Sequence, residues 1–356
     1  LRAQFTFDKK WALQNVYPIS YNGIPDEHKP FVIGSAQRYF AKKNQPRKEE
    51  APLYELAILR DENEVDAPSD EKALKRFVRA AEKVGIGVEF ITKEDYGRIA
   101  EFDALFIRET NNINNHTYRF SRRAAAEGLV VIDDTSSILK SNKVYQQELL
   151  KHHKVPIPKT FIVHKKTDLK QVADDLGFPC VLKQPDSSFS LGVMKVENTE
   201  ELNEKVSFLL GKSDLILVQE FLSTDFDWRI GIINKKPLYA CKYYMADKHW
   251  QIIKRDHQGK KKEGNSETLP IEQVPKHVVD TALKAANLIG DGLYGVDLKE
   301  IGNKAFIIEV NDNPNIEVGY EDAVLKDELY ERIIGVFLQR LEQHRSRRSG
   351  NGAAPV

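Results

Sequence analysis

The spacing of hydrophobic and polar positions changes once along the chain, near residue 142. Before that point, short apolar runs alternate with segments whose apolar residues recur at helical spacing, a pattern typical of strands joined by helices. The strands are expected at 54–60, 88–91, 104–107 and 129–132, and the helices at 69–84 and 117–127. Such alternation predicts a parallel sheet with right-handed crossovers. Residues 53–140 are therefore expected to form a small α/β domain, without the glycine-rich first turn of a dinucleotide-binding domain.

The helix expected at 69–84 carries the clearest of these signals. Ser69 is the expected N-cap, because a serine oxygen can accept a hydrogen bond from a backbone N–H of the first turn. Gly85 is expected to end the helix. The apolar stripe of this helix consists of Ala73, Leu74, Phe77, Val78 and Ala81.

Beyond residue 142 the pattern favours further strands, some paired as hairpins, separated by helices. Gly302 and Asn303 are expected to form the turn of the last hairpin. The helices are expected at 143–152, 166–176, 199–210, 275–289 and 328–343. The strands are expected at 160–163, 180–184, 192–196, 215–220, 228–233, 237–245, 294–300 and 305–311.

Both ends of the chain carry weaker patterns. Residues 1–50 have no clean period, and we expect a short helix near 30–40 followed by a charged linker at 42–50. The small, polar tail from Ser346 is expected to be disordered. The chain begins with Leu1, which leaves open a start further upstream, and no signal-peptide pattern is visible. The expected divisions are 1–50, 51–140, 141–345 and 346–356.

Composition narrows the class of protein. The 356 residues are 41% hydrophobic and 30% charged, as in ordinary folded proteins. The 53 basic residues balance 53 acidic ones, so no net charge favours nucleic acid or an anionic membrane. No apolar run approaches the roughly 18 residues that cross a bilayer. Cys180 and Cys241 are isolated, which argues against a zinc site or a disulfide framework and favours a cytoplasmic setting.

Three oxygen-bearing side chains near the end of the chain suggest a metal site. Glu309 and Asn311 are two residues apart on one expected strand, so both point to the same face. The hairpin partner strand can bring Asp297 beside them. Two carboxylates and an amide oxygen form a hard donor set that suits Mg²⁺. A solvated sheet face is the alternative, but carboxylates within so apolar a strand need a partner.

A lysine followed by small residues suggests a phosphate site. Lys183 ends an apolar strand, and the loop at 186–193 is rich in serine. Backbone N–H groups of such a loop can bind phosphate, and Lys143 is a second candidate cation. The Walker-type phosphate loop is absent. An ordinary hairpin turn and a solvated lysine fit these residues equally well.

The apolar segment 217–222 contains Gln219 and Glu220, where the expected strand ends, and Asp227 and Arg229 follow closely. Backbone groups at the end of a strand can bind an adenine edge, and a carboxylate can bind ribose hydroxyls. A buried strand followed by surface charges is the alternative, and these residues alone leave both open.

The order and spacing of these residues resemble the ATP-grasp fold, and within it the RimK-type glutamate ligases, over about residues 140–340. The preceding α/β domain resembles a pre-ATP-grasp domain. Residues 1–135, with 105–110 and 131–134, are similar to the back part of the RimK-like N-terminal domain. The expected fold class is thus α/β (α+β ATP-grasp): a parallel pre-ATP-grasp domain followed by a two-lobed ATP-grasp domain.

The resemblance also implies roles for single residues. ATP phosphates would be bound by Lys143 and Lys183. The lid loop would be 187–192, with Ser187, Ser188 and Ser190. The adenine hinge would be Gln219, Glu220, Phe221 and Leu222, and Asp227 would bind the ribose. Magnesium, with Mn²⁺ as the alternative metal, would be bound by Asp297, Glu309 and Asn311. Arg229 and Lys242 would face the γ-phosphate and an acyl phosphate.

The implied activity is ATP- and Mg²⁺-dependent joining of a carboxylate to an amine through an acyl phosphate. The expected partners are therefore ATP, a carboxylate and an amino acid such as glutamate; a homo-oligomer is compatible with this. The lid is rich in serine and phenylalanine rather than glycine, and 312–320 is more polar than usual, so the substrates stay open. A kinase-like phosphotransferase and a non-catalytic ATP-binding regulator are the alternatives.

Overall fold

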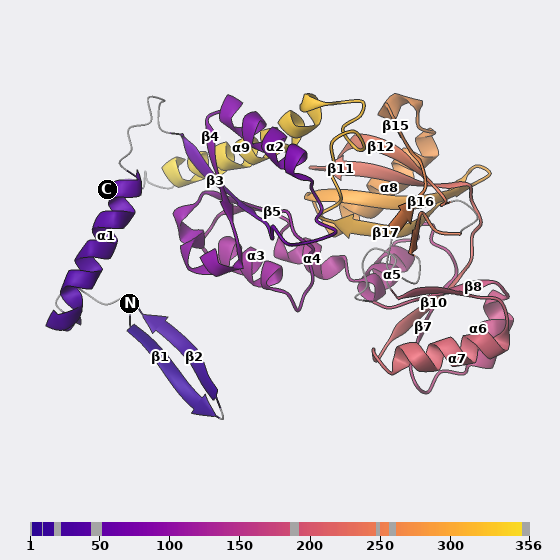
Figure 1. Cartoon of the computed structure of the whole chain (residues 1–356). Helices are drawn as coiled ribbons and strands as arrows, with labels where there is room; N and C mark the ends of the chain where they lie inside the picture. The colour runs from indigo at the N-terminus through magenta and orange to yellow at the C-terminus, as the bar shows by residue number, and fades with distance from the viewer. Residues whose placement is uncertain are drawn as a thin grey trace. The chain divides into compact units, whose positions relative to one another are not determined.

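The first half of the larger structural unit contains a parallel four-stranded sheet in the order β4-β3-β5-β6 (Figure 1). Its strands are β3 (Tyr54–Leu59), β4 (Ile86–Ile91), β5 (Ala104–Ile107) and β6 (Val130–Ile132). The predicted parallel sheet is therefore confirmed. The connecting helices are α2 (Glu71–Lys83), the 3-10 helix η3 (Lys93–Glu101), α3 (His116–Ala126) and, after the last strand, α4 (Thr135–Lys140).

The N-cap of α2 differs by one residue from the prediction. Asp70 caps this helix, and its side chain accepts a hydrogen bond from the backbone N–H of Ala73 at 2.9 Å. Ser69 is instead buried and forms a parallel β-bridge with Ile316. The prediction was wrong because a serine and an aspartate stand side by side, and local chemistry does not decide between two good caps.

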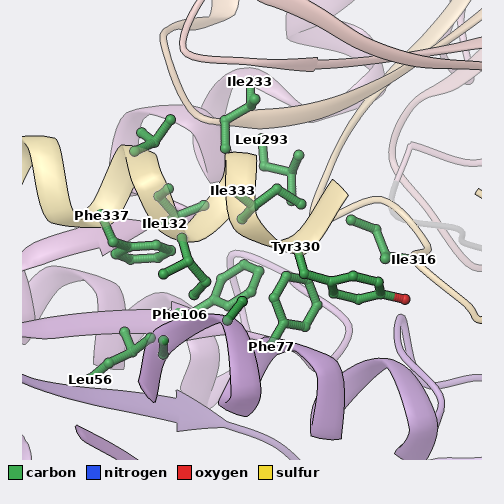
Figure 2. Packing of buried hydrophobic residues seen from close by; sticks show 14 of the residues in the cluster. Leu56, Phe77, Phe106, Ile132, Ile233, Leu293, Ile316, Tyr330, Ile333 and Phe337 are labelled. Atoms are coloured by element: carbon green, nitrogen blue, oxygen red, sulfur yellow. The ribbon is translucent and has the colours of Figure 1, made fainter. Parts of the chain in front are cut away.

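The last helix, α9 (Asp327–Gly350), packs on the first sheet although almost the whole chain separates them. Figure 2 shows Phe77, Phe106, Tyr330 and Phe337 in one cluster, with edge-on ring contacts at 4.8–5.4 Å between centroids. Ile233 and Leu293 of the C-terminal sheet join the same core. One core therefore unites the C-terminal sheet, α9 and the parallel sheet.

The helix α9 continues to Gly350, so the predicted disorder from Ser346 is wrong for the first five residues of the tail.

The second half of this unit has two lobes, each built on an antiparallel sheet. The smaller sheet has the order β7-β10-β8-β9, and α6 (Leu169–Leu176) and α7 (Thr199–Leu210) pack on it (Figure 1). Its strands are β7 (Thr160–Val163), β8 (Cys180–Lys183), β9 (Val193–Val196) and β10 (Ile216–Glu220).

The larger sheet has the order β15-β12-β11-β16-β17, and α8 (Lys276–Ile289) covers one of its faces. Its strands are β11 (Phe226–Ile233), β12 (Lys236–Tyr244), β15 (Ser266–Leu269), β16 (Leu293–Ile301) and β17 (Lys304–Asp312). The predicted hairpin turn is confirmed, with Gly302 in the left-handed region at φ 59°. The helix α5 (Lys143–His152) enters this half, and β13 (Ile253–Arg255), β14 (Lys261–Glu263) and the 3-10 helix η4 (Ile271–Gln273) complete it.

Residues 1–51 form a separate unit. It contains an antiparallel hairpin of β1 (Arg2–Asp8) and β2 (Lys10–Tyr17), then the 3-10 helix η2 (Asp26–His28) and α1 (Lys29–Lys43). The predicted helix is confirmed, whereas the hairpin was not anticipated.

The computed structural model describes residues 2–8, 10–17, 23–43, 52–185, 192–246, 250–255 and 261–350. Among them, no helix is long and apolar enough to cross a membrane.

Candidate active site

A cavity of about 390 Å³ opens between the two lobes. The ends of β8 and β10 line it from the small lobe, and the exposed face of β11, β16 and β17 lines it from the large lobe. The loop after β5 and the segment after β17 close its far end. The cavity therefore collects side chains from both lobes and from the parallel sheet's domain.

Strand alternation and register place the candidate metal-binding side chains together. Arg229 pairs with Asp297 across β11 and β16, and Asp297 pairs with Glu309 across β16 and β17. Asn311 lies two residues after Glu309 and also lines the cavity. Directly opposed residues share a face of a sheet, so all four side chains point away from α8 and into the cavity.

Each of the two candidate carboxylate ligands is paired with a cation. The guanidinium of Arg229 donates two hydrogen bonds to the Asp297 carboxylate, at 2.7 and 2.8 Å. Lys143 Nζ lies 2.7 Å from Glu309 Oε1. Asn311 Nδ2 donates to Asp297 Oδ2 at 3.1 Å. Oxygen donors of this kind fit Mg²⁺. The described residues hold no cluster of three or more carboxylate, histidine or cysteine ligands, so phosphate oxygens would have to complete the coordination.

The cavity wall changes the ionisation of two central groups. Burial alone would raise the pKa of Glu309, but Lys143, Lys183 and Arg229 outweigh it and hold the pKa below its ordinary value. Burial lowers the pKa of Lys183 to about 8. No described carboxylate forms an ion pair with Lys183, whereas Lys143 and Arg229 each have one. An ammonium group in this position gains most from an anionic ligand.

A third lysine, which the sequence reasoning missed, lies beside the candidate ribose-binding carboxylate. Lys299 Nζ forms an ion pair with Asp227 and donates to Thr224 Oγ1 at 2.7 Å. Burial raises the pKa of Asp227, and Lys299 opposes that effect. Lys299 follows Asp297 by two residues on β16, so strand alternation alone was a signal that could have identified it.

The predicted hinge residues line the cavity, but two of their side chains are committed elsewhere. Gln219 Nε2 donates to Thr160 Oγ1 at 2.8 Å, and Glu220 Oε1 accepts from the backbone N–H of Lys159 at 2.7 Å. At these two positions, only backbone groups are left to bind an adenine base.

Aromatic and apolar groups surround this hinge. Phe221 and Leu222 line the cavity, as does Trp250, whose ring meets that of Phe221 edge-on at 5.9 Å. Lys195 Nζ lies 4.6 Å from the centre of the Phe221 ring. Trp250 and Lys195 were not anticipated, because both come from segments whose approach to the hinge depends on tertiary structure.

Lys242 does not face the cavity, which corrects the prediction that it lies beside the γ-phosphate. Lys242 pairs directly with Trp228, and its Nζ lies 5.2 Å from that ring and 5.0 Å from the ring of Phe226. Trp228 belongs to the core under α8, on the face opposite Arg229. The error arose because the face of a strand residue depends on register, and β12 has one extra residue, Leu238, opposite the step from Gly231 to Ile232 of β11.

The predicted lid residues Ser187, Ser188 and Ser190 lie outside the described residues. Pro185 and Val193, on either side of that segment, both line the cavity.

A buried arginine joins the parallel sheet's domain to the segment after β17. Arg108 is 1% exposed and donates to Asn313 Oδ1 at 2.6 Å and to the carbonyl oxygen of Pro314 at 2.9 Å. Asn313 in turn donates to the carbonyl oxygen of Glu109 at 2.6 Å. These contacts hold the far wall of the cavity in place.

The fold is shared with solved ATP-grasp structures. D-alanine–D-alanine ligase from Bacillus anthracis superimposes with a TM-score of 0.63 at 15% identity, over 83% of this chain and 99% of that one. A RimK domain ATP-grasp protein from Sphaerobacter thermophilus superimposes with a TM-score of 0.58 at 15% identity, over 80% of this chain and 99% of that one. These likenesses establish the ATP-grasp fold.

Sequence relatives point to the same class. A probable alpha-L-glutamate ligase of Vibrio vulnificus is 25% identical over 233 residues, 64% of this chain and 74% of the relative. The alpha-aminoadipate–LysW ligase LysX of Saccharolobus solfataricus is 25% identical over 252 residues, which are 67% of this chain and 88% of the relative. The fold, the cavity and these relatives define an ATP-grasp enzyme of the class that forms carbon–nitrogen bonds. Residues 140–334, more than half of the chain, match the RimK-like ATP-grasp domain, and the chain belongs to that family.

Proposed function

We propose that this protein uses ATP to convert a carboxylate into an acyl phosphate and joins the acyl group to an amine. The observation that carries the proposal is the convergence of Lys143, Lys183 and Arg229 on the cavity that also holds Asp297 and Glu309. Cations together with oxygen ligands for a hard metal suit a triphosphate and its metal ion.

The nucleotide is expected to lie with its base at the hinge and its phosphates near Lys183. Backbone groups from Glu220 to Leu222 would bind the adenine edge, and Val181 and Val193 offer apolar surface beside it. The Asp227 carboxylate would accept hydrogen bonds from the ribose hydroxyls while it keeps its ion pair with Lys299.

Asp297, Glu309 and Asn311 would hold Mg²⁺, or Mn²⁺ in its place. The metal would neutralise charge on the phosphate oxygens when bound.

The cations of the chain supply the remaining electrostatic stabilisation. A carboxylate is a poor electrophile, because displacement by an amine would require oxide to leave. A carboxylate oxygen attacks the γ-phosphorus, the bond to the β–γ bridging oxygen breaks, and ADP leaves. Negative charge is then spread over the transferring group, where Lys143, Lys183 and Arg229 can stabilise it. The amine next attacks the acyl carbon and loses a proton, and phosphate leaves.

The amine is proposed to be an amino acid, because the named relatives ligate glutamate or aminoadipate. The far end of the cavity carries hydrogen-bonding groups that suit such a substrate, including Thr110, Asn111 and Asn315. The carboxylate would come from a peptide, a protein or a small molecule.

An ADP-release screen tests the proposal. Amino acids are paired with candidate carboxylates, including peptide C-termini, and products are identified by mass spectrometry. We expect ADP formation that requires both partners and a product joined by an amide bond. ADP formation with an alcohol and no amine would instead support a phosphotransferase, and nucleotide binding without turnover for any pair would support a regulator.

A further inference from the structure

Protein cations stand directly beside the candidate metal ligands. Lys143, Lys183, Arg229 and Lys299 line the cavity together with Asp227, Asp297 and Glu309. The other carboxylates of the lining are Glu220, Asp312, Glu317 and Glu321. A free divalent cation that approaches Asp297 or Glu309 is therefore repelled by the cation already paired with that carboxylate.

The carboxylate ligands are also individually occupied. Lys143 Nζ lies 2.7 Å from Glu309 Oε1, and the Lys143 side chain is only 14% exposed. Arg229 covers both oxygens of Asp297 in a bidentate pair, and its side chain is 20% exposed. Partly buried, charge-assisted pairs of this kind are stronger than surface ones, so a metal ion competes with a protein cation for each of the two carboxylates.

We propose that Lys143 acts as a counter-ion gate: it occupies Glu309 until a nucleotide arrives, so that the divalent metal binds only together with the nucleotide. The inference rests on the proposed nucleotide site. A triphosphate offers Lys143 a new anionic partner, and its phosphate oxygens are further ligands for the metal. Lys143 then moves from the carboxylate to the phosphates, and Glu309 becomes available to the metal.

The gate can be tested by metal binding alone, using Mn²⁺ and the loss of its free-ion EPR signal. We expect wild-type protein to bind Mn²⁺ weakly by itself and tightly with the non-hydrolysable analogue AMP-PNP. Lys143→Met should raise Mn²⁺ affinity without nucleotide by about tenfold or more, the effect of removing one charge-assisted competitor. Adding Glu309→Gln to Lys143→Met should abolish that gain and so locate the metal at Glu309.

Lys83→Met is the matched control, because Lys83 forms an exposed ion pair with Glu331 at 2.6 Å in the parallel sheet's domain. Its Mn²⁺ affinity should equal that of wild type. Tight Mn²⁺ binding by wild type without nucleotide, or no gain in Lys143→Met, would overturn the gate. Lys143→Gln, which removes the same charge, gives a second arm with the same expected gain if Lys143→Met does not fold. Failure of wild type to bind AMP-PNP at all would count against the proposed function, whereas the nucleotide-free arms still decide the gate.

Discussion

Single residues of the cavity wall have separable roles, and Glu309 offers the sharpest test of the metal site. Glu309→Gln keeps the side chain's shape but removes the charge. We expect turnover to be abolished with little change in melting temperature, because the site loses a metal ligand while packing is preserved. Melting temperature and ADP release are measured on the same preparation. Near-normal turnover would remove Glu309 from the site.

Lys183 should make nucleotide affinity depend on pH. Its pKa is lowered to about 8 by burial, so it is charged at neutral pH and loses its proton as pH rises through that value. Phosphate favours the ammonium form, so AMP-PNP affinity should be full below about pH 8 and fall above it. Titration calorimetry across this range checks the trend.

Two substitutions at Lys183 control that experiment. Lys183→Ala should weaken AMP-PNP binding by about 2 kcal/mol at neutral pH, the loss of one charge-assisted contact. Lys183→Arg stays charged and should flatten the pH profile. A wild-type affinity that does not change between pH 7 and 9 would mean that Lys183 does not touch the phosphates.

Lys242 and Arg229 form a matched pair that tests the two faces of the large sheet. Lys242→Met should leave AMP-PNP affinity within about 0.5 kcal/mol of wild type, because the side chain lies with Trp228 and Phe226 under α8. Arg229→Met should weaken turnover strongly. Turnover is measured in both variants. An equal loss of turnover in the two would contradict the assignment of Lys242 to the face of the sheet opposite the cavity.

At the residue level, the sequence predicted which side chains come together where local alternation was enough. Asp297, Glu309 and Asn311 converge because residues two apart on a strand share a face and the hairpin between them is short. The prediction for Lys242 failed because the face on which its side chain lies depends on the register between β11 and β12, which a bulge shifts. The commitment of the Gln219 side chain to Thr160 depends on pairing between β10 and β7, which sequence spacing does not reveal.

At the scale of elements, the contact between β5 and the segment after β17 is predicted to be essential for stability. Arg108→Met removes the donor to Asn313 and to two backbone carbonyl groups, and leaves those acceptors buried. We expect a loss of about 3 kcal/mol or more in the free energy of unfolding, measured by urea denaturation. Arg332→Met, which removes only an exposed pair with Glu328, should cost less than about 1 kcal/mol. Similar costs for both would contradict a clamp at Arg108.

The elements themselves were mostly predictable from sequence, and their partners were not. The alternation at 53–140 identified the parallel sheet, but nothing local indicated that α9 would join its core. Tyr330 and Phe337 of α9 contact Phe77 of α2 and Phe106 of β5, so α9 shares with α2 the covering of that side of the sheet. The hairpin of β1 and β2 was missed although β1 alternates polar and apolar residues, because β2 breaks that alternation with three consecutive apolar residues at 11–13.

At the scale of the whole molecule, the cavity runs from a half between the lobes, where we propose that the nucleotide binds, to a polar end near the parallel sheet. This arrangement, together with membership of the RimK-like ATP-grasp family, supports an order in which phosphoryl transfer precedes amide formation. The cations and the candidate metal ligands gather where the β- and γ-phosphates would lie. Cys180 and Cys241 are buried, and burial raises the pKa of both thiols, so neither is suited to hold an acyl group.

The most direct test of this account follows one oxygen atom. A carboxylate substrate labelled with ¹⁸O in both oxygens is incubated with ATP and the amine, and the released phosphate is analysed by mass spectrometry. An acyl-phosphate route transfers one labelled oxygen to phosphate in every turnover and yields ADP. Unlabelled phosphate, or label appearing in AMP, would contradict activation at the γ-phosphate.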